Sequence, residues 1–381
     1  MTMGLKEGSM PTALARPTSI AEVQAAVRAA APGSRILARG RGTKTALSSL
    51  PDGAIALDLS GLSGMVEYEP GEFTFTALAG TPISEIAVAL AEHGQYLPFD
   101  PPLAEAGATL GGTLAAGLSG PGRYRYGGVR DFILGVRFVD GAGEVVHTGG
   151  KVVKNAAGFD ISKLMVGSLG SLGVLGALTF KIFPKPESYA TLRQSYTTLD
   201  LALAALYRLT GSQMELFALD LEPTPDGATL LVRLGGLTGA LPDRFERLRG
   251  LTGGGAILVE GGDAAIWRDA TEFTWAPEGC SVIKVPVTPG RIAGLESDLA
   301  SFASANLSGL PVRRYSAGGQ VVWLALRGPL DALDGLLTKL GLSGLVVLGQ
   351  PGHVRLGVRT GESFERRVKA ALDPGGRFME V

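Results

Sequence analysis

The stretch that decides the fold reads Gly-Ala-Thr-Leu-Gly-Gly-Thr-Leu-Ala-Ala-Gly-Leu-Ser-Gly at residues 107–120. Two further glycine clusters follow, Tyr-Gly-Gly-Val-Arg-Asp-Phe-Ile-Leu-Gly at 126–135 and Gly-Ser-Leu-Gly-Ser-Leu-Gly-Val-Leu-Gly at 167–176. Glycine lacks a Cβ atom, so it adopts backbone angles that other residues avoid and lets the main chain approach a ligand closely. Apolar, β-branched runs such as Phe132–Val139 separate the clusters, which predicts an ordered sheet with tight turns rather than a linker. Main-chain N–H groups laid along a large anionic ligand would explain such a density of glycine.

Length and composition favour a two-domain globular protein. The chain has 381 residues, of which 45% are apolar and 19% charged, and this length exceeds the size at which a single core keeps growing. The net charge of −1 gives no electrostatic footprint for nucleic acid. No apolar run is long enough to span a membrane, and Met1–Pro17 lacks the charged-then-apolar layout of a signal peptide. We therefore expect a cytoplasmic protein, or one held at the inner membrane through a partner.

The single cysteine and the few histidines exclude several kinds of site. Cys280 stands alone in the sequence, so the chain has no internal disulfide and no cysteine-ligated iron–sulfur cluster. The three histidines, His93, His147 and His353, have no short metal-binding spacing. We therefore expect no metal site and no Ser-His-Asp triad, and the histidines fit surface or turn positions.

Turn and helix signals predict an α+β chain with a boundary near residue 186. Ser19-Ile20-Ala21-Glu22 has the spacing of a capping box and predicts a helix to about Ala31. Pro184-Lys185-Pro186 marks the boundary, and it divides the chain into domains 1–186 and 187–355 and a C-terminal segment, 356–381, that returns to the first domain. Strands are expected near 54–59, 64–69, 73–79 and 174–183, a hairpin over 132–148, and helices near 160–166, 201–210, 242–251 and 363–371.

A basic, glycine-spaced loop is the first candidate for ligand binding. It reads Arg39-Gly40-Arg41-Gly42-Thr43-Lys44-Thr45 and follows a predicted strand. Successive N–H donors beside three cationic side chains suit a pyrophosphate, whose oxygens need several donors and neutralising charge. The alternative is an exposed basic turn without a ligand. Neither the Gly-x-Gly-x-x-Gly fingerprint nor a Walker A loop fits these residues.

Five segments in one order carry a family resemblance. They are the basic loop, the turn Pro98-Phe99-Asp100-Pro101-Pro102 with Ala108-Thr109-Leu110-Gly111-Gly112-Thr113, Tyr126-Gly127-Gly128, Asn155-x-x-Gly158-Phe159-Asp160, and the cluster from Gly167 to Val174. The second of these taken alone fits a proline turn and a helix start. The series over residues 10–186 resembles the FAD-binding domain of the vanillyl-alcohol oxidase and para-cresol methylhydroxylase (PCMH) family. Within it, Leu118-Ser119-Gly120-Pro121 and Lys154–Asp160 resemble the E subunits of bacterial glycolate oxidases.

The resemblance implies a fold and a cofactor site. The fold would be a PCMH-type FAD-binding domain of two α+β subdomains, followed by a smaller α+β cap domain. Noncovalent FAD is implied, because the basic loop offers no histidine or cysteine for attachment. The pyrophosphate would be held by Arg39, Gly40, Arg41, Gly42, Thr43 and Lys44. The flavin and ribityl chain would be lined by Pro101, Thr109, Gly111, Gly112, Thr113 and Ala116, then by Ser119, Gly120, Gly127 and Gly128, and the main chain of Val174 would meet the adenine.

The same resemblance implies an oxidoreductase, although the catalytic residues stay unknown. Catalytic hydroxyacid dehydrogenases of the family carry a Glu within the Gly-Ser-x-Gly motif, where this chain has Leu169. In the second domain Trp267, Trp275, Lys284, Arg313 and Arg314 could bind a substrate carboxylate, yet such residues are more often core or surface groups.

Three functions follow from these observations. The leading hypothesis is an FAD-binding subunit of a glycolate oxidase or dehydrogenase complex that converts glycolate to glyoxylate. It would be an accessory or electron-passing chain beside a catalytic FAD-binding sister subunit and a cysteine-rich iron–sulfur subunit. The alternatives are an autonomous FAD-dependent 2-hydroxyacid or sugar-acid dehydrogenase, and a flavin-fold scaffold without catalysis.

Overall fold

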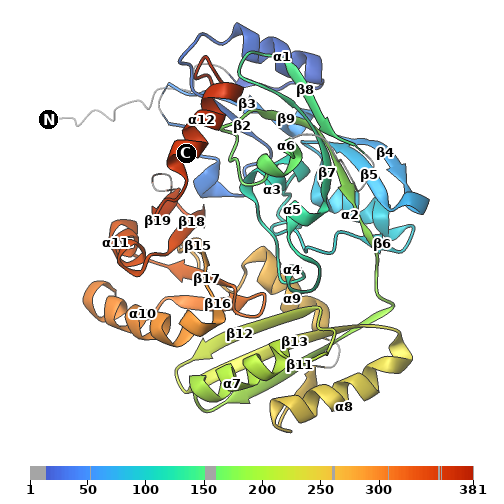
Figure 1. Ribbon diagram of the computed structural model, residues 1–381, viewed down its shortest axis with the longest axis vertical. Coiled ribbons are helices and arrows are strands. Elements are labelled where there is room, and N and C mark those ends of the chain that lie inside the picture. The colour runs from blue at the N-terminus through green and yellow to red at the C-terminus, as the bar shows by residue number, and fades with distance from the viewer. Residues whose placement is uncertain are drawn as a thin grey trace, which may run out of the picture.

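The computed structural model describes residues 14–51, 53–150, 160–259, 262–307, 309–350, 352 and 354–380. The first part of the chain forms two main sheets (Figure 1). One is a parallel sheet in the order β1 (Leu14–Ala15), β3 (Ile55–Asp58), β2 (Ile36–Arg39). The other is antiparallel, in the order β4 (Met65–Glu69), β5 (Thr74–Leu78), β9 (Val174–Lys181), β7 (Ile133–Val139), β8 (Val145–Gly149).

Short helices and turns connect these strands. The α-helices are α1 (Ile20–Ala29), α2 (Ile83–Ala91), α3 (Leu110–Ala116), α4 (Arg123–Tyr126), α5 (Val129–Phe132) and α6 (Ile161–Leu164). The 3₁₀ turns are η1 (Thr45–Leu47), η2 (Leu59–Gly61) and η3 (Pro70–Glu72). A small ribbon pairs β6 (Gln95–Tyr96) with β10 (Phe183–Pro184) and leads the chain out of this domain.

The structure confirms the predicted start of α1 and corrects the predicted ends of α1 and β9. The Ser19 hydroxyl accepts a hydrogen bond from the Glu22 N–H at 3.2 Å, which confirms the predicted cap of α1. The helix ends at Ala29 rather than Ala31, and Gly33 (φ 78°) forms the turn that follows. The predicted strand 174–183 ends as β9 at Lys181, and Phe183, with Pro184, pairs with β6 instead.

The second part of the chain forms one nine-stranded antiparallel sheet. Its order is β14 (Ile257–Val259), β11 (Ser188–Tyr196), β13 (Gly227–Gly236), β12 (Ala218–Thr224), β16 (Val312–Ser316), β17 (Val321–Leu326), β15 (Ser281–Pro286), β18 (Ser343–Leu348), β19 (Arg355–Gly357). The helices are α7 (Leu199–Thr210), α8 (Leu241–Thr252), α9 (Asp263–Glu272), α10 (Ile292–Asn306), α11 (Leu330–Leu340) and α12 (Glu362–Leu372), with 3₁₀ turns η4 (Thr238–Ala240) and η5 (Pro289–Arg291).

This sheet is built from two copies of one motif. β11-α7-β12-β13-α8-β14 and β15-α10-β16-β17-α11-β18 both follow the β-α-β-β-α-β order. The two copies meet where β12 pairs with β16, at Leu221 and Tyr315. Because each copy places its second strand at this junction, the strand order of one copy is the mirror of the other. The α+β fold class is confirmed, and the internal repeat was not predicted.

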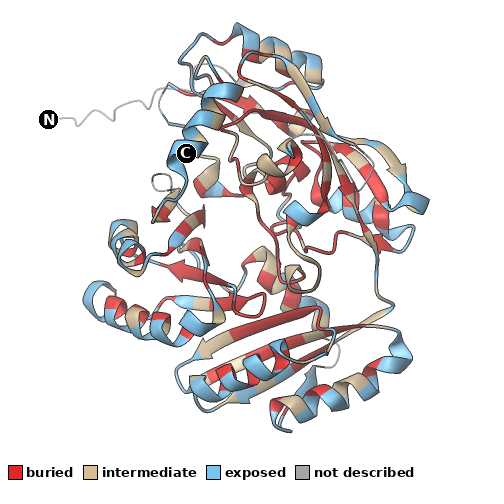
Figure 2. Cartoon of the chain, in the orientation of Figure 1, coloured by how far each residue is buried: buried red, intermediate tan, exposed pale blue. Residues whose placement is uncertain are grey.

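The two faces of the nine-stranded sheet have different neighbours. Side chains of one face pack with α7, α8, α10 and α11 in one buried cluster, so this face is the outer one. Val282, Trp323 and Val347 point the other way and share a buried cluster with Phe99 and Leu114 of the first domain. Figure 2 shows the strands of both domains as mostly buried, and α9 lies between β12 and the first domain in Figure 1. The inner face therefore packs directly on the first domain.

Buried ion pairs hold the inner face together. The Asp220 carboxylate, which is fully buried, accepts hydrogen bonds from Arg314 Nε at 2.7 Å and from the Ser316 hydroxyl at 2.8 Å. Arg314 also pairs with Glu222 at 2.9 Å. A buried charge is tolerated only when its partner is retained, because desolvation of an unpaired ion is costly.

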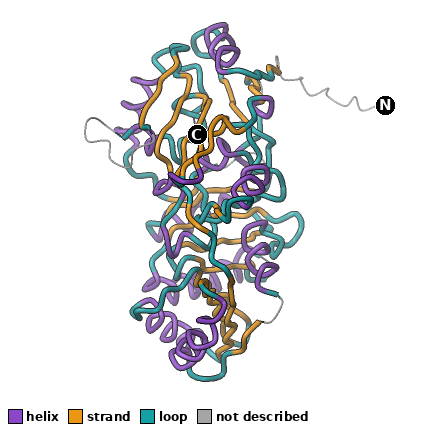
Figure 3. The backbone as a smooth tube through the Cα atoms, turned by 90° about the vertical axis from the view of Figure 1, so that its right-hand side faces the viewer, coloured by secondary structure: helices purple, strands orange, loops and turns teal. Residues whose placement is uncertain are grey.

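The C-terminal segment lies against the first domain. Beyond α12, the Ile36 N–H donates to the Arg377 carbonyl at 2.8 Å and the Met379 N–H donates to the Ile36 carbonyl at 3.2 Å. These bonds add residues 377–379 as an extra parallel partner of β2. In the side view the C-terminus again lies within the upper part of the molecule, which contains the first domain (Figure 3).

We predict that Asp220→Ala destabilises the second domain by about 3–5 kcal/mol, because it leaves the Arg314 guanidinium buried without its main partner. Glu222→Ala should cost only about 1 kcal/mol, since a third of that side chain is exposed. Urea unfolding followed by tryptophan fluorescence measures both changes. Equal losses of stability for the two variants would contradict the assigned role of Asp220.

Candidate functional site

A cavity of about 550 Å³ is the candidate site. Its wall brings together the basic loop after β2, the start of α3, the turn before β9, and the C-terminal segment. The volume lies within the range of about 300–1,000 Å³ typical of cofactor pockets. The predicted site residues that line it are Arg39, Gly40, Arg41, Gly42, Thr43, Lys44, Thr109, Gly111, Gly112 and Ala116.

The basic loop presents unused donors to this cavity. Gly42 has a φ of 71°, and the space where a Cβ would lie is open. The N–H groups of Gly42, Thr43 and Lys44 donate to no acceptor within the described part of the chain. Backbone donors left free at a cavity wall are suited to phosphate oxygens.

Lys44 is the buried cation of the loop. Its side chain is only 5% exposed, and within the described ranges its ammonium forms no ion pair closer than 4 Å. Burial lowers the pKa of Lys44 to about 8, and the more distant Glu272 carboxylate opposes this shift. A bound dianion would supply the missing counter-charge.

The glycines of α3 let three segments approach one another. A Cβ on Gly111 would lie 2.7 Å from the Ala79 Cβ, and a Cβ on Gly40 would overlap the Thr109 hydroxyl. The Gly111 N–H donates to the Ala79 carbonyl at 2.7 Å, and the Gly112 N–H donates to the Thr109 hydroxyl at 3.2 Å. These two N–H groups are therefore used within the protein, and Gly111 serves close packing at the cavity wall.

Seven predicted site residues do not line the cavity, and their cofactor roles stay predictions. The Ser119 hydroxyl accepts the Val129 N–H at 2.9 Å, and a Cβ on Gly120 would overlap the Asp100 carbonyl. Thr113 is fully buried, and its hydroxyl has no partner in the described structure. The seven residues are Pro101, Thr113, Ser119, Gly120, Gly127, Gly128 and Val174.

Sequence reasoning missed two parts of the wall. The first is the turn before β9, where Gly170 (φ 79°) and Leu169 (φ 52°) line the cavity. The repeated glycines of 167–176 were a usable signal for it. The second comes from the other end of the chain and carried no local motif: Val354, Arg355, Arg359, Met379 and Glu380.

Some predicted features lie outside the residues that the structure describes. The segment from Asn155 to Phe159 and His353 are outside the described residues. Among those that are described, no group of three metal-ligating side chains comes together. No helix in the same residues is long and apolar enough to cross a membrane.

Comparison with known proteins identifies the class of this site. The family model described as an FAD binding domain matches residues 11–149, which contain the basic loop and α3. This part of the chain is thus an FAD binding domain, and FAD is its cofactor. The cavity fits that cofactor in volume, in its basic loop and in its free N–H donors.

The relatives are oxidoreductases by name. The chain is 40% identical over 201 residues to glycolate oxidase subunit GlcE of Escherichia coli, a match that covers 51% of this chain and 54% of that protein. It is 30% identical over 196 residues to glycolate oxidase subunit GlcD of Bacillus subtilis, covering 51% and 42%. It is 33% identical over 186 residues to a D-2-hydroxyglutarate dehydrogenase of Xanthomonas citri, covering 48% and 39%. The matches span about half the length of these relatives or less.

A solved structure supports the fold over nearly the whole chain. Alkyldihydroxyacetonephosphate synthase superposes with a TM-score of 0.74 and 16% identity, covering 98% of this chain and 78% of that one. This likeness extends the confirmed fold through the nine-stranded sheet and carries no statement about activity.

We predict that Gly111→Ala strongly weakens FAD binding, because its Cβ would clash with Ala79 and displace α3 from the cavity wall. The overpacking should also cost about 1–3 kcal/mol of stability. Gly112→Ala is the matched control, since its Cβ would meet only the Thr109 hydroxyl, at 3.0 Å. Flavin fluorescence titration and thermal unfolding measure the two effects, and similar FAD affinities for both variants would refute the packing argument.

We further predict that FAD affinity falls as the pH rises through about 8, where Lys44 loses its proton in the free protein. The bound pyrophosphate favours the protonated form, so the complex takes up a proton above this pH and its dissociation constant increases. Titrations of FAD between neutral and alkaline pH test this. Lys44→Met should bind FAD more weakly and lose this pH dependence; an unchanged pH profile in the variant would exclude Lys44 as its source.

Proposed function

We propose that this chain is the FAD-binding subunit of a glycolate oxidase or dehydrogenase complex that converts glycolate to glyoxylate. The observation that carries the proposal is the cavity of the FAD binding domain, whose basic loop and α3 lie within the region matched by the FAD family. The names of the relatives, glycolate oxidase subunits GlcE and GlcD, supply the reaction.

Different residues of the chain bind different parts of the cofactor. Arg39, Arg41 and Lys44 neutralise the pyrophosphate, while the free N–H groups after Gly42 bind its oxygens. The resemblance extends the site along the seven residues that lie away from the cavity wall, with Val174 at the adenine end. When bound, FAD accepts a hydride equivalent, and the protein positions and tunes it.

The inner face of the nine-stranded sheet supports an accessory, electron-passing role. A hydroxyacid substrate needs a free cation for its carboxylate, yet Arg314 is held by Asp220 and Glu222. Arg233 is likewise paired with Asp263 at 2.6 Å. The gap between this face and Gly120 has no room for a water-sized molecule. Lys284, another half-buried candidate, donates to the Gly117 carbonyl at 3.2 Å and forms no ion pair with a carboxylate that the structure describes, so of the candidate cations it alone keeps an unneutralised charge.

Substrate oxidation and onward electron transfer would be carried out by other subunits of the complex. A catalytic FAD-binding sister subunit would oxidise the 2-hydroxy acid, and an iron–sulfur subunit would carry electrons onward, because this chain has only one cysteine. We place the complex in glyoxylate metabolism and in the cytoplasm, the alternative being attachment to the inner membrane through its other subunits.

We predict that the isolated, FAD-loaded chain keeps its visible flavin absorbance when glycolate or D-lactate is added without oxygen. The physical reason is that the candidate carboxylate-binding arginines of the inner face are already paired. Dithionite, as the positive control, should bleach the same sample. Bleaching by glycolate would favour an autonomous dehydrogenase, and a colourless protein that binds no FAD would favour a scaffold.

A further inference from the structure

The wall of the cofactor cavity is completed by the last residues of the chain. Arg355 begins β19, the edge strand of the nine-stranded sheet, Arg359 follows that strand, and Met379 and Glu380 follow α12, yet all four line the same cavity as the basic loop. The region matched by the FAD family ends at residue 149. This part of the wall therefore lies outside the matched domain.

Hydrogen bonds fix this C-terminal segment in place. The Lys369 ammonium donates to the Ser171 carbonyl at 2.9 Å, to the Phe378 carbonyl at 3.1 Å and to the Asp373 carboxylate at 2.6 Å. Asp373 is 3% exposed and also accepts the N–H groups of Arg377 and Phe378. The segment then runs beside β2, the strand that leads into the basic loop.

The two arginines of this wall, Arg355 and Arg359, differ in whether their guanidinium groups are paired with a carboxylate. Arg355 forms two hydrogen bonds with the Glu365 carboxylate, at 3.2 and 3.0 Å, so its charge is already neutralised. Arg359 has no hydrogen bond or ion pair with any residue that the structure describes. Glu380 adds a negative charge to the same wall, which would repel an anionic ligand. Of the two arginines, Arg359 therefore has a guanidinium that is free to neutralise an anionic ligand in the cavity.

We propose that Arg359 is a cofactor-binding residue that pairs with the FAD pyrophosphate, and that the docked C-terminal segment holds it in position. The inference rests on the proposed binding of FAD in this cavity. A guanidinium suits a pyrophosphate because its N–H groups form parallel hydrogen bonds to phosphate oxygens. The C-terminal segment is then part of the cofactor site, and FAD binding is linked to its docking.

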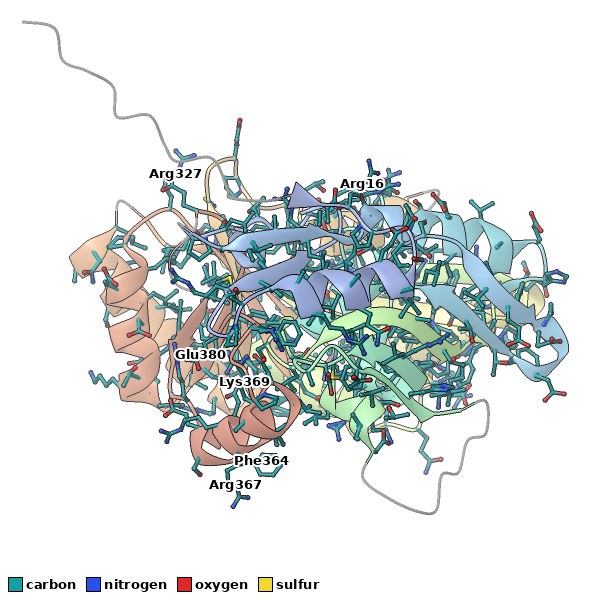
Figure 4. The ribbon with its side chains drawn as sticks, turned by 90° about the horizontal axis from the view of Figure 1, so that it is seen from above. Arg16, Arg327, Phe364, Arg367, Lys369 and Glu380 are labelled. Carbon is teal, nitrogen blue, oxygen red and sulfur yellow. The ribbon has the colours of Figure 1, made fainter. Side chains whose placement is uncertain are left out.

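The first test compares Arg359→Ala and Arg359→Glu with Arg367→Ala in the full-length chain. Arg367 is the matched control, because it extends from α12 away from the body of the molecule, next to Phe364 (Figure 4). FAD, ADP and riboflavin are titrated, the last because it lacks the pyrophosphate. We expect Arg359→Ala to weaken FAD binding about 10-fold or more, Arg359→Glu to weaken it further, and Arg367→Ala to leave it unchanged.

The ligands separate the possible outcomes. Loss of FAD and ADP binding in the Arg359 variants, with riboflavin binding unchanged, supports contact with the pyrophosphate. An Arg359→Ala variant with the wild-type dissociation constant for FAD overturns the inference and leaves the proposed function standing. A wild-type chain that binds no FAD overturns both.

The second test concerns the docked segment. Lys369→Met removes three hydrogen bonds of the segment, so FAD affinity should fall, and Lys369→Arg should restore part of it. By reciprocity FAD should slow hydrogen exchange of the Ile36 and Met379 amides. Unchanged exchange on adding saturating FAD, together with unchanged affinity in Lys369→Met, would show that docking and cofactor binding are independent.

Discussion

The site depends on one close approach, between the Thr109 side chain and the basic loop. The Thr109 hydroxyl caps α3 by accepting the Gly112 N–H, and it occupies the space where Gly40 would carry a Cβ. Two residues further on, Gly111 packs on Ala79, which directly follows β5. Without Cβ atoms at these two glycines, the loop, the helix and the antiparallel sheet meet at a single point. The position of the cationic loop, and with it the place proposed for the pyrophosphate, follows from that contact.

The nine-stranded sheet packs on the first domain through its inner face. Alternation along β17 places Trp323 toward the first domain and Leu324 toward the outer helices. Across the face, Arg314 and Arg233 are paired with carboxylates rather than left for a ligand. Such pairs contribute little net stability and fix the geometry strongly, because separating them exposes an uncompensated charge. The same residues that position the sheet are thereby withdrawn from substrate binding.

Sequence reasoning reached the parts of the molecule that local signals determine. The capping spacing at Ser19 predicted α1, and the glycine loop Arg39–Lys44 predicted a cationic wall that the structure places at the cavity. Burial of Lys44 could not be read from the sequence, since it depends on contacts with distant segments. The internal repeat of the second domain was missed because it preserves the order of elements rather than residues. The position of Arg359 in the cavity wall was missed because proximity between segments more than three hundred residues apart leaves no local pattern.

Cofactor binding and substrate turnover both require an unpaired positive charge, but each requires it on a different surface of this chain. Binding requires cations without protein partners, and the cavity offers Lys44, which is buried and forms no ion pair within 4 Å with any residue that the structure describes. Turnover of a 2-hydroxy acid requires the same property on the sheet that faces the first domain, where Arg314 and Arg233 are instead paired with carboxylates. Because a guanidinium already paired in a buried site cannot exchange its partner without a large desolvation cost, the two surfaces are suited to different tasks. This division is what the proposed function requires, in which the chain holds FAD and a second protein presents the substrate.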